Sequence, residues 1–135
     1  EHAMRIATTA SRASAQAWLT NAVTLEPGSI YALSFDYLTP NAAKGSCSWR
    51  VMDDANFPGD VNIIQEDATA RRTTPFHYEL PNSGGGESWR KFFSRFRVLT
   101  PMTKKRFRIH FINQAVGMKN ALYIKNVQLW KVSDD

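Results

Sequence analysis

The sequence predicts an all-β fold in which two antiparallel sheets pack face to face, as in a β-sandwich or jelly roll. Three observations support this prediction: short stretches alternate apolar and polar residues with a period of two, turn-forming residues separate them, and helical periodicity is scarce. Many short strands with turns between them are typical of sandwiches and barrels. A chain of 135 residues has the usual size of one domain, so we expect residues 1–135 to form a single domain.

The first clear strand signal lies at residues 29–38, S-I-Y-A-L-S-F-D-Y-L. Its expected core-facing residues are Tyr31, Leu33, Phe35 and Tyr37. The sequence Glu26-Pro27-Gly28 predicts a tight turn before this strand. Residues 10–19 alone have a helix-forming composition, and an extended segment of small residues explains them equally well.

Three later stretches continue the strand pattern. Residues 46–52 and 105–112 alternate in the same way, with Cys47, Trp49 and Val51 on the apolar face of the first and Phe107, Ile109 and Phe111 on that of the second. Residues 88–99 form a longer aromatic strand, in which the adjacent Phe92 and Phe93 break the period of two and predict a bulge or bend. Residues 53–72 are polar and irregular, apart from a short strand expected near residues 61–64.

The closing stretch, A-L-Y-I-K-N-V-Q-L-W at residues 121–130, also has the composition of a strand. A polar pair, Lys125 and Asn126, interrupts its alternation. This interruption fits a β-bulge that reorients the strand.

The charge balance of the chain is basic, with a net charge of +5 and a sequence pI of about 9.6. Such a balance favours an acidic partner, whether polysaccharide, nucleic acid or anionic membrane, although a basic soluble surface explains it equally well. No apolar run approaches the roughly 20 residues of a membrane span. The single cysteine, Cys47, excludes an internal disulfide.

Three ordered segments carry a resemblance to a known group of β-sandwiches. They are V-T-L-E-P-G-S-I-Y-A-L-S-F-D-Y at residues 23–37, S-W-R-K-F-F-S-R-F at residues 88–96, and L-Y-I-K-N-V-Q-L at residues 122–129. In this order and spacing the chain resembles the jelly-roll carbohydrate-binding modules of families 4, 9 and 22, which belong to the galactose-binding-like β-sandwiches. The early H-A-M-R-I at residues 2–6 is also similar to a strand of that group.

The resemblance implies a galactose-binding-domain-like fold and a non-catalytic module that binds a polysaccharide chain, with an acidic chain favoured by the basic surface. It also implies attachment to a secreted polysaccharide-active enzyme, and hence an extracellular location. In that family the closing strand usually reads I-D-N-V, and its Asp helps to bind a structural calcium ion. Lys125 stands at this position here, and a cation cannot ligate Ca²⁺, so we expect that the usual calcium site is lost or that the Lys125 ammonium takes the place of the ion. We therefore expect no cofactor, with a structural calcium ion as the alternative. The alternative explanation of Lys125 is an ordinary solvent-facing residue.

The candidate binding site is expected on the polar faces of the predicted strands. Polar groups on such a face hydrogen-bond sugar hydroxyls, and arginine side chains donate paired hydrogen bonds to carboxylate or sulfate groups. A flat aromatic ring stacks on the apolar face of a sugar ring. The residues we expect in this site are Trp18, Arg50, Tyr78, Arg106, Arg108 and His110. The alternative for the same face is a solvated surface without a ligand.

The remaining aromatic candidates are expected elsewhere. Trp49 shares the core parity of its strand, Trp89 corresponds to an inward position of the family, and Trp130 is placed as a cap on the sandwich.

Three other functions fit the sequence less well. A structural or protein-interaction domain of a larger surface protein, with no glycan site, is the first alternative. Nucleic-acid binding is the second, since arginine and aromatic residues interleave at residues 89–97, but no nucleic-acid motif is present. An enzyme comes last, because neither a Cys47–histidine pair nor a carboxylate pair shows catalytic spacing. The acidic residues 53–60 and the glycines 84–86 are best explained as a solvated turn and a flexible connection.

Overall fold

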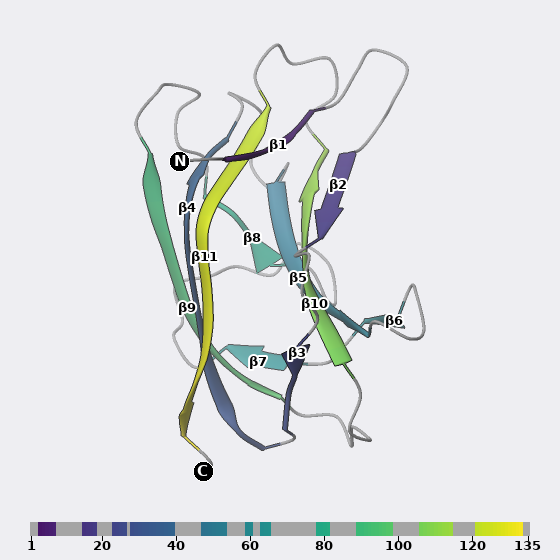
Figure 1. The fold of residues 1–135 in the computed structure, drawn as a ribbon, viewed down its shortest axis with the longest axis vertical. Helices are drawn as coiled ribbons and strands as arrows, with labels where there is room; N and C mark the ends of the chain where they lie inside the picture. The colour runs from purple at the N-terminus through teal and green to yellow at the C-terminus, as the bar shows by residue number, and fades with distance from the viewer. Residues whose placement is uncertain are drawn as a thin grey trace.

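The fold is all-β, with antiparallel pairing throughout the described strands (Figure 1). The computed structural model describes residues 3–7, 15–18, 23–26, 28–39, 47–53, 59–60, 63–65, 78–81, 89–98, 106–114 and 121–133. These residues contain strands, turns and irregular segments, and no helix. The prediction of an all-β antiparallel fold is therefore confirmed. Within the described ranges there is accordingly no helix long and apolar enough to cross a membrane.

The strands form two sheets. The five-stranded sheet has the order β1 (Met4–Ile6), β11 (Leu122–Ser133), β4 (Ile30–Leu38), β9 (Arg90–Val98) and β7 (Ile63–Gln65). The six-stranded sheet has the order β2 (Ala15–Trp18), β10 (Arg106–Asn113), β5 (Cys47–Asp53) and β6 (Gly59–Asp60), with β3 (Val23–Thr24) beside β10 and β8 (Tyr78–Glu79) beside β5. The stretch 10–19 thus contributes a strand, β2, over the residues that the structure describes, and the rest of it lies outside them.

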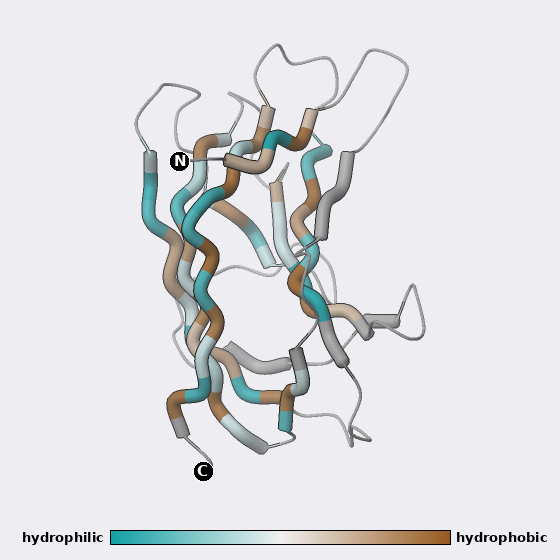
Figure 2. The backbone as a smooth tube through the Cα atoms, viewed as in Figure 1, coloured by the Kyte–Doolittle hydropathy of each residue, from teal (hydrophilic) through white to brown (hydrophobic). Residues whose placement is uncertain are grey.

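Aromatic rings from both sheets fill the space between the layers. Phe35 of β4 stacks on Phe92 of β9, with ring centroids 4.8 Å apart, and meets Phe111 of β10 edge-on at 5.0 Å. Trp49 of β5 packs against Phe92 from the opposite sheet at 5.8 Å. Figure 2 shows the alternation that makes this possible, with hydrophobic and hydrophilic residues following one another along the long strands. The predicted inward aromatic faces of β4, β5 and β10 are confirmed by these contacts.

Polar side chains join the two layers at their ends. The Tyr37 hydroxyl on β4 donates to the carbonyl of Pro81, which follows β8, at 2.7 Å. The buried Asn113 amide on β10 donates to the carbonyl of Ile6 on β1 at 3.0 Å. Each bond joins a side chain of one sheet to a backbone carbonyl on the other side of the sandwich, and it fixes one sheet relative to the other.

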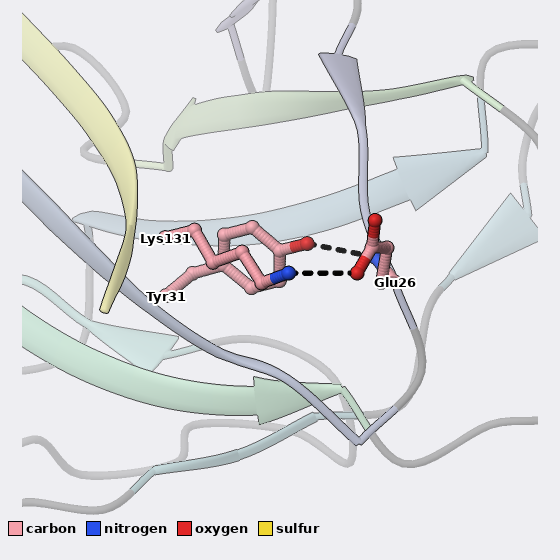
Figure 3. Close-up of polar contacts among 3 residues, drawn as sticks. All are labelled: Glu26, Tyr31 and Lys131. Atoms are coloured by element: carbon pink, nitrogen blue, oxygen red, sulfur yellow. Dashed lines mark hydrogen bonds and ion pairs between the residues drawn. The ribbon is translucent and has the colours of Figure 1, made fainter. Parts of the chain in front are cut away.

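The turn before β4 is anchored to the far end of β11 (Figure 3). Gly28 has φ 81°, the left-handed region that a tight turn requires and that glycine adopts without strain. The Glu26 amide donates to the Tyr31 hydroxyl at 2.8 Å, and the Lys131 ammonium lies 2.8 Å from the Glu26 carboxylate. Since both charged partners are exposed, the ion pair orients the turn and contributes little stability.

The bulge predicted in β9 is wrong. This strand pairs with β4 without a register shift from Arg90, opposite Tyr37, to Arg97, opposite Ile30. Phe92 is buried, whereas Phe93 is 47% exposed and lies on the opposite face of the same regular strand. The two phenylalanines are adjacent because both faces of this strand carry an aromatic ring.

The bulge predicted in β11 is confirmed. Its pairing with β4 shifts between Lys125, opposite Asp36, and Gln128, opposite Ser34, so that two residues of β11 face one residue of β4. Asn126 adopts φ 55° at this point. The extra residue reverses the parity of the strand, so Ile124 before it and Val127 after it both pack toward the core.

Candidate functional site

The polar face predicted to be an open binding surface lies on the six-stranded sheet, on the side turned away from the aromatic core. It is not open. Met52, His110 and Ile112 are at most 2% exposed, and Ser48 is also buried. The outer face of the central strands β5 and β10 is therefore largely covered, with Arg50 and Arg108 partly exposed. The prediction that His110 faces solvent is wrong, because the residue is fully buried. Polar side chains on a covered face need hydrogen-bonding partners, because burial removes them from water.

Arg50 and His110 form the centre of this face. They are directly opposed in the pairing of β5 with β10, and the Arg50 Nε–H donates to His110 Nδ1 at 2.7 Å. Because Nδ1 accepts this bond, the imidazole is neutral and carries its proton on Nε2. Trp18 of β2 is the register partner of His110 on the other side, so three of the expected residues occupy one row across β2, β10 and β5.

Glu79 adds a carboxyl group to the same face. It is the register partner of Ser48 on β5 and is buried, as Ser48 is. Its neighbours Tyr78 and Leu80 belong to the core on the other side of the sheet, which turns Glu79 toward the face that carries Arg50. We call Ser48, Arg50, Glu79 and His110 the buried polar cluster; three of them are buried and Arg50 is partly buried. A carboxyl, a guanidinium and an imidazole on adjacent strands form a group of donors and acceptors suited to bind, and to exchange protons with, a small polar ligand.

The other expected residues lie apart from this cluster or at its margin. Arg108 is half-buried beside Met52, one step along the sheet from His110. Arg106 pairs with Thr24 of β3, and its side chain lies outside the described residues. Tyr78 is 2% exposed, and its ring lies 5.0 Å from that of Trp49 inside the sandwich. The prediction that Tyr78 stacks on an external ligand is therefore wrong, because the ring is part of the core.

The remaining tryptophans divide between the core and the surface. Trp49 is fully buried, as predicted. The inward position predicted for Trp89 is wrong, since the residue is 37% exposed, and Trp130 lies on the outer face of the five-stranded sheet instead of capping the sandwich. The acidic segment 54–58 and the glycines 84–86 lie outside the described residues.

Sequence reasoning missed Glu79 as a member of the site. The signal was present, since Tyr78, Glu79 and Leu80 alternate as a strand would, and a carboxyl between two core residues must face the opposite side of its sheet. What the alternation does not show is that this opposite side is covered.

The residues around Lys125 do not fit a calcium site. The Lys125 ammonium lies 4.0 Å from the centre of the Trp89 ring, and its register partner Asp36 accepts a hydrogen bond from the Asn126 amide at 2.8 Å. No group of three His, Cys, Asp or Glu residues suited to a metal occurs among the residues that the structure describes. The Asn126 hydrogen bond and Lys91 lower the pKa of Asp36, so its carboxylate is held by protein groups.

The absence of a structural metal stays a prediction, and chelation tests it. We expect millimolar EDTA to leave the unfolding temperature of the purified chain unchanged within about 1 °C, because a metal bound to the folded state would otherwise stabilise it by mass action. Thermal unfolding followed by circular dichroism measures this. A fall of several degrees that added Ca²⁺ reverses would contradict it.

Comparisons with known proteins place the chain by fold. No protein-family model matches it, and no curated protein matches it. A solved cyclase from Fischerella sp. TAU, in complex with 4-(1H-indol-3-yl)butan-2-one, matches with a TM-score of 0.56 at 14% identity, over 98% of this chain and 64% of that chain. The Stig cyclase Fisc from Fischerella sp. TAU, in complex with (3Z)-3-(1-methyl-2-pyrrolidinylidene)-3H-indole, matches with a TM-score of 0.52 at 14% identity, over 90% and 57%.

These neighbours correct the functional expectations drawn from the sequence. They are cyclases with small indole-type ligands, so the assignment to the carbohydrate-binding modules, the non-catalytic role and the polysaccharide partner are all wrong. The chain spans less than two thirds of the length of either neighbour. At this level of identity, the likeness is one of fold.

Proposed function

We propose that this chain is a domain of a cyclase-type enzyme that binds a small indole-bearing molecule at the buried polar cluster. The observation that carries the proposal is the placement of Glu79, Arg50 and His110 on one covered face of adjacent strands. A structural domain gains nothing from burying a carboxyl and an imidazole on one face beside a partly buried guanidinium, because each group loses hydration. Sites that perform proton transfer or hold polar ligands are where such clusters concentrate.

The chemistry of the cluster supports a ligand with one acceptor atom and an aromatic body. Arg50 and a neutral His110 with its proton on Nε2 are both hydrogen-bond donors, suited to a ketone or imine acceptor. The neighbour's ligand 4-(1H-indol-3-yl)butan-2-one combines a ketone with an indole ring. Trp18 occupies the register position next to His110, which puts an aromatic residue in the same row. Glu79 is the carboxyl group of the cluster, and we assign to it the proton-transfer role in ring closure.

The finer fold assignment belongs to the same proposal. We infer a jelly roll of the galactose-binding-like kind. Its support is that successive long strands change sheet, with β4, β9 and β11 in one layer and β5 and β10 in the other, and that the closing strand β11 lies between β1 and β4. The extent of the domain, residues 1–135, and an extracellular location stay predictions from the sequence.

Calorimetric titration of the chain with 4-(1H-indol-3-yl)butan-2-one tests the proposed ligand class. We expect saturable binding, weakened at least about tenfold by Arg50→Met, which keeps the aliphatic stem and removes the donors. Glu79→Gln keeps the shape of the side chain and removes the acid, so it should bind within about threefold of the wild type yet lose any ring-closing turnover. Lys131→Met on the five-stranded sheet is the matched control and should bind normally.

The folded state of each variant is checked by its unfolding temperature before the titration. Absence of binding to the folded wild-type chain at millimolar ligand would overturn the proposed ligand class. Equal weakening by Arg50→Met and Lys131→Met would place the ligand elsewhere than in the buried polar cluster.

A further inference from the structure

The outer face of the five-stranded sheet carries an aromatic surface that the proposed function does not use. The large hydrophobic residues exposed in the described part of the chain all belong to it or to its margin: Trp89, Phe93, Trp130 and Val132. Figure 1 shows β9, β4 and β11 side by side in one layer, and these strands supply the surface. We call Trp89, Phe93, Trp130 and Val132, with Lys91, Arg95 and Lys125, the outer aromatic face.

The centre of this face is a pair of rings laid over small residues. Phe93 of β9 is opposite Ser34, and Trp130 of β11 is opposite Ala32, so the two rings approach from either side of β4. Their centroids are 6.1 Å apart. Ala32 is fully buried and Ser34 nearly so, although both point away from the core. The rings therefore cover the middle of the sheet and leave their own outer surfaces, 47% and 42% exposed, to a partner.

The bulge in β11 produces this arrangement. Without the extra residue at Asn126, the parity of Ile124 would carry on and would turn Trp130 into the core. A left-handed residue at a bulge reorients the part of the strand that comes after it. Here it delivers Trp130 to the outside of the sheet, while Val132 lies at a second register shift, between Lys131 and Ser133.

The positive charges around the two rings favour a negatively charged partner. Among the described residues of this face, Lys91, Arg95 and Lys125 share it with the ring pair and with one carboxylate, Asp36, which lies between Lys91 and Lys125 in the register. A second copy of this basic chain would bring the same cations together across a two-fold axis, which disfavours self-association. Two half-exposed rings that contact each other over a β-sheet also fit a membrane poorly, since interfacial aromatics must enter the headgroup layer by roughly 5–10 Å.

We propose that the outer aromatic face is a docking surface for an acidic polypeptide that lays an apolar side chain on Phe93 and Trp130. Central aromatic anchors with charged residues at the rim are the composition of protein interfaces, where tryptophan and arginine contribute most of the affinity. Carboxylates of the partner would meet Lys91, Arg95 and Lys125. This surface lies on the opposite sheet from the buried polar cluster, so the proposal stands independently of the ligand proposed above.

Fluorescence anisotropy with labelled peptides tests this proposal. The probe is a 12-residue peptide of glutamate interrupted by phenylalanine and leucine, and the controls replace either the glutamates by lysine or the apolar residues by serine. We expect the acidic apolar peptide alone to bind, with affinity falling at least about tenfold in Trp130→Ala and Phe93→Ala. Lys131→Ala is the matched control, since Lys131 follows Trp130 but pairs with Glu26.

Each alternative outcome overturns the proposal. Equal binding of the glutamate and lysine peptides, or no binding of either, would remove the acidic partner. A wild-type dimer in sedimentation that dissociates in Trp130→Ala would make a second copy the occupant. Binding to phosphatidylserine vesicles that Trp130→Ala abolishes would make it a membrane. We expect both variants to fold, because the rings removed are 47% and 42% exposed, and the unfolding temperature of each variant checks this.

Discussion

Replacing Phe92 by alanine should destabilise the chain by about 3–5 kcal/mol, which is a large part of the total stability of a domain of this size. Phe92 is 6% exposed and stacks on Phe35 at 4.8 Å, while Trp49 meets it edge-on at 5.8 Å from the other sheet. Its removal therefore leaves a cavity at the point where the two layers touch. Urea unfolding followed by tryptophan fluorescence measures the loss.

The next residue along the strand is the control. Phe93 has the same chemistry and the same strand, but it is 47% exposed on the outer face. We expect Phe93→Ala to cost less than about 1 kcal/mol, because a partly exposed ring gains little from folding. Similar losses in the two variants would contradict the regular alternation of β9 and would restore the bulge that the sequence predicts.

The comparison of these two phenylalanines shows what sequence patterning resolves. Strands such as β4 and β10 alternate strictly, so their core faces are determined by parity alone. In β9 both faces carry a ring, and parity does not show whether Phe92 and Phe93 are adjacent through a bulge or through a two-sided strand. The pairing partner decides this, because the unbroken register with β4 leaves no extra residue.

Sequence reasoning predicts part of the candidate site: it predicts which face of the strands carries the site residues, but not whether that face is covered. The pattern places Arg50, Arg108 and His110 on the face of the six-stranded sheet that turns away from the core. A period of two distinguishes the two faces of a strand but does not show which faces are covered. His110 is fully buried on its face, whereas Trp130 is 42% exposed on the outer face of the other sheet. Coverage depends on how distant segments pack, which no local pattern records.

The resemblance to carbohydrate-binding modules led to a wrong function for a similar reason: local patterns predict strands and do not determine function. Its segments describe strands and turns that unrelated functions share, and solved cyclases have the same fold over most of this chain. Lys125 is the residue at which this sequence differs from the pattern of the carbohydrate-binding modules. Its ammonium lies over Trp89, in a position where the family would have a carboxylate.

Cys47 should make the folded state sensitive to alkaline pH. Its thiol is 3% exposed, Sγ lies 3.6 Å from the Asn113 side-chain oxygen, and burial raises its pKa from 9.0 to about 12. The folded state therefore favours the neutral thiol, and the unfolded chain releases the proton near pH 9. The stability contributed by this group is complete below pH 9 and is lost as the pH rises toward 12.

The expected loss is about 1.4 kcal/mol for each pH unit above 9, and about 4 kcal/mol at most by pH 12. Burial also raises the pKa of Tyr37, which adds a loss of the same sign at higher pH, so the wild-type curve alone does not isolate the thiol. Cys47→Ala isolates it, because alanine occupies the same core position and does not ionise. Urea unfolding of both proteins between pH 8 and 11 should show the wild type losing stability faster than the variant above pH 9. Parallel curves would mean that the thiolate is tolerated between the sheets, and that the core around Asn113 admits water in the folded state.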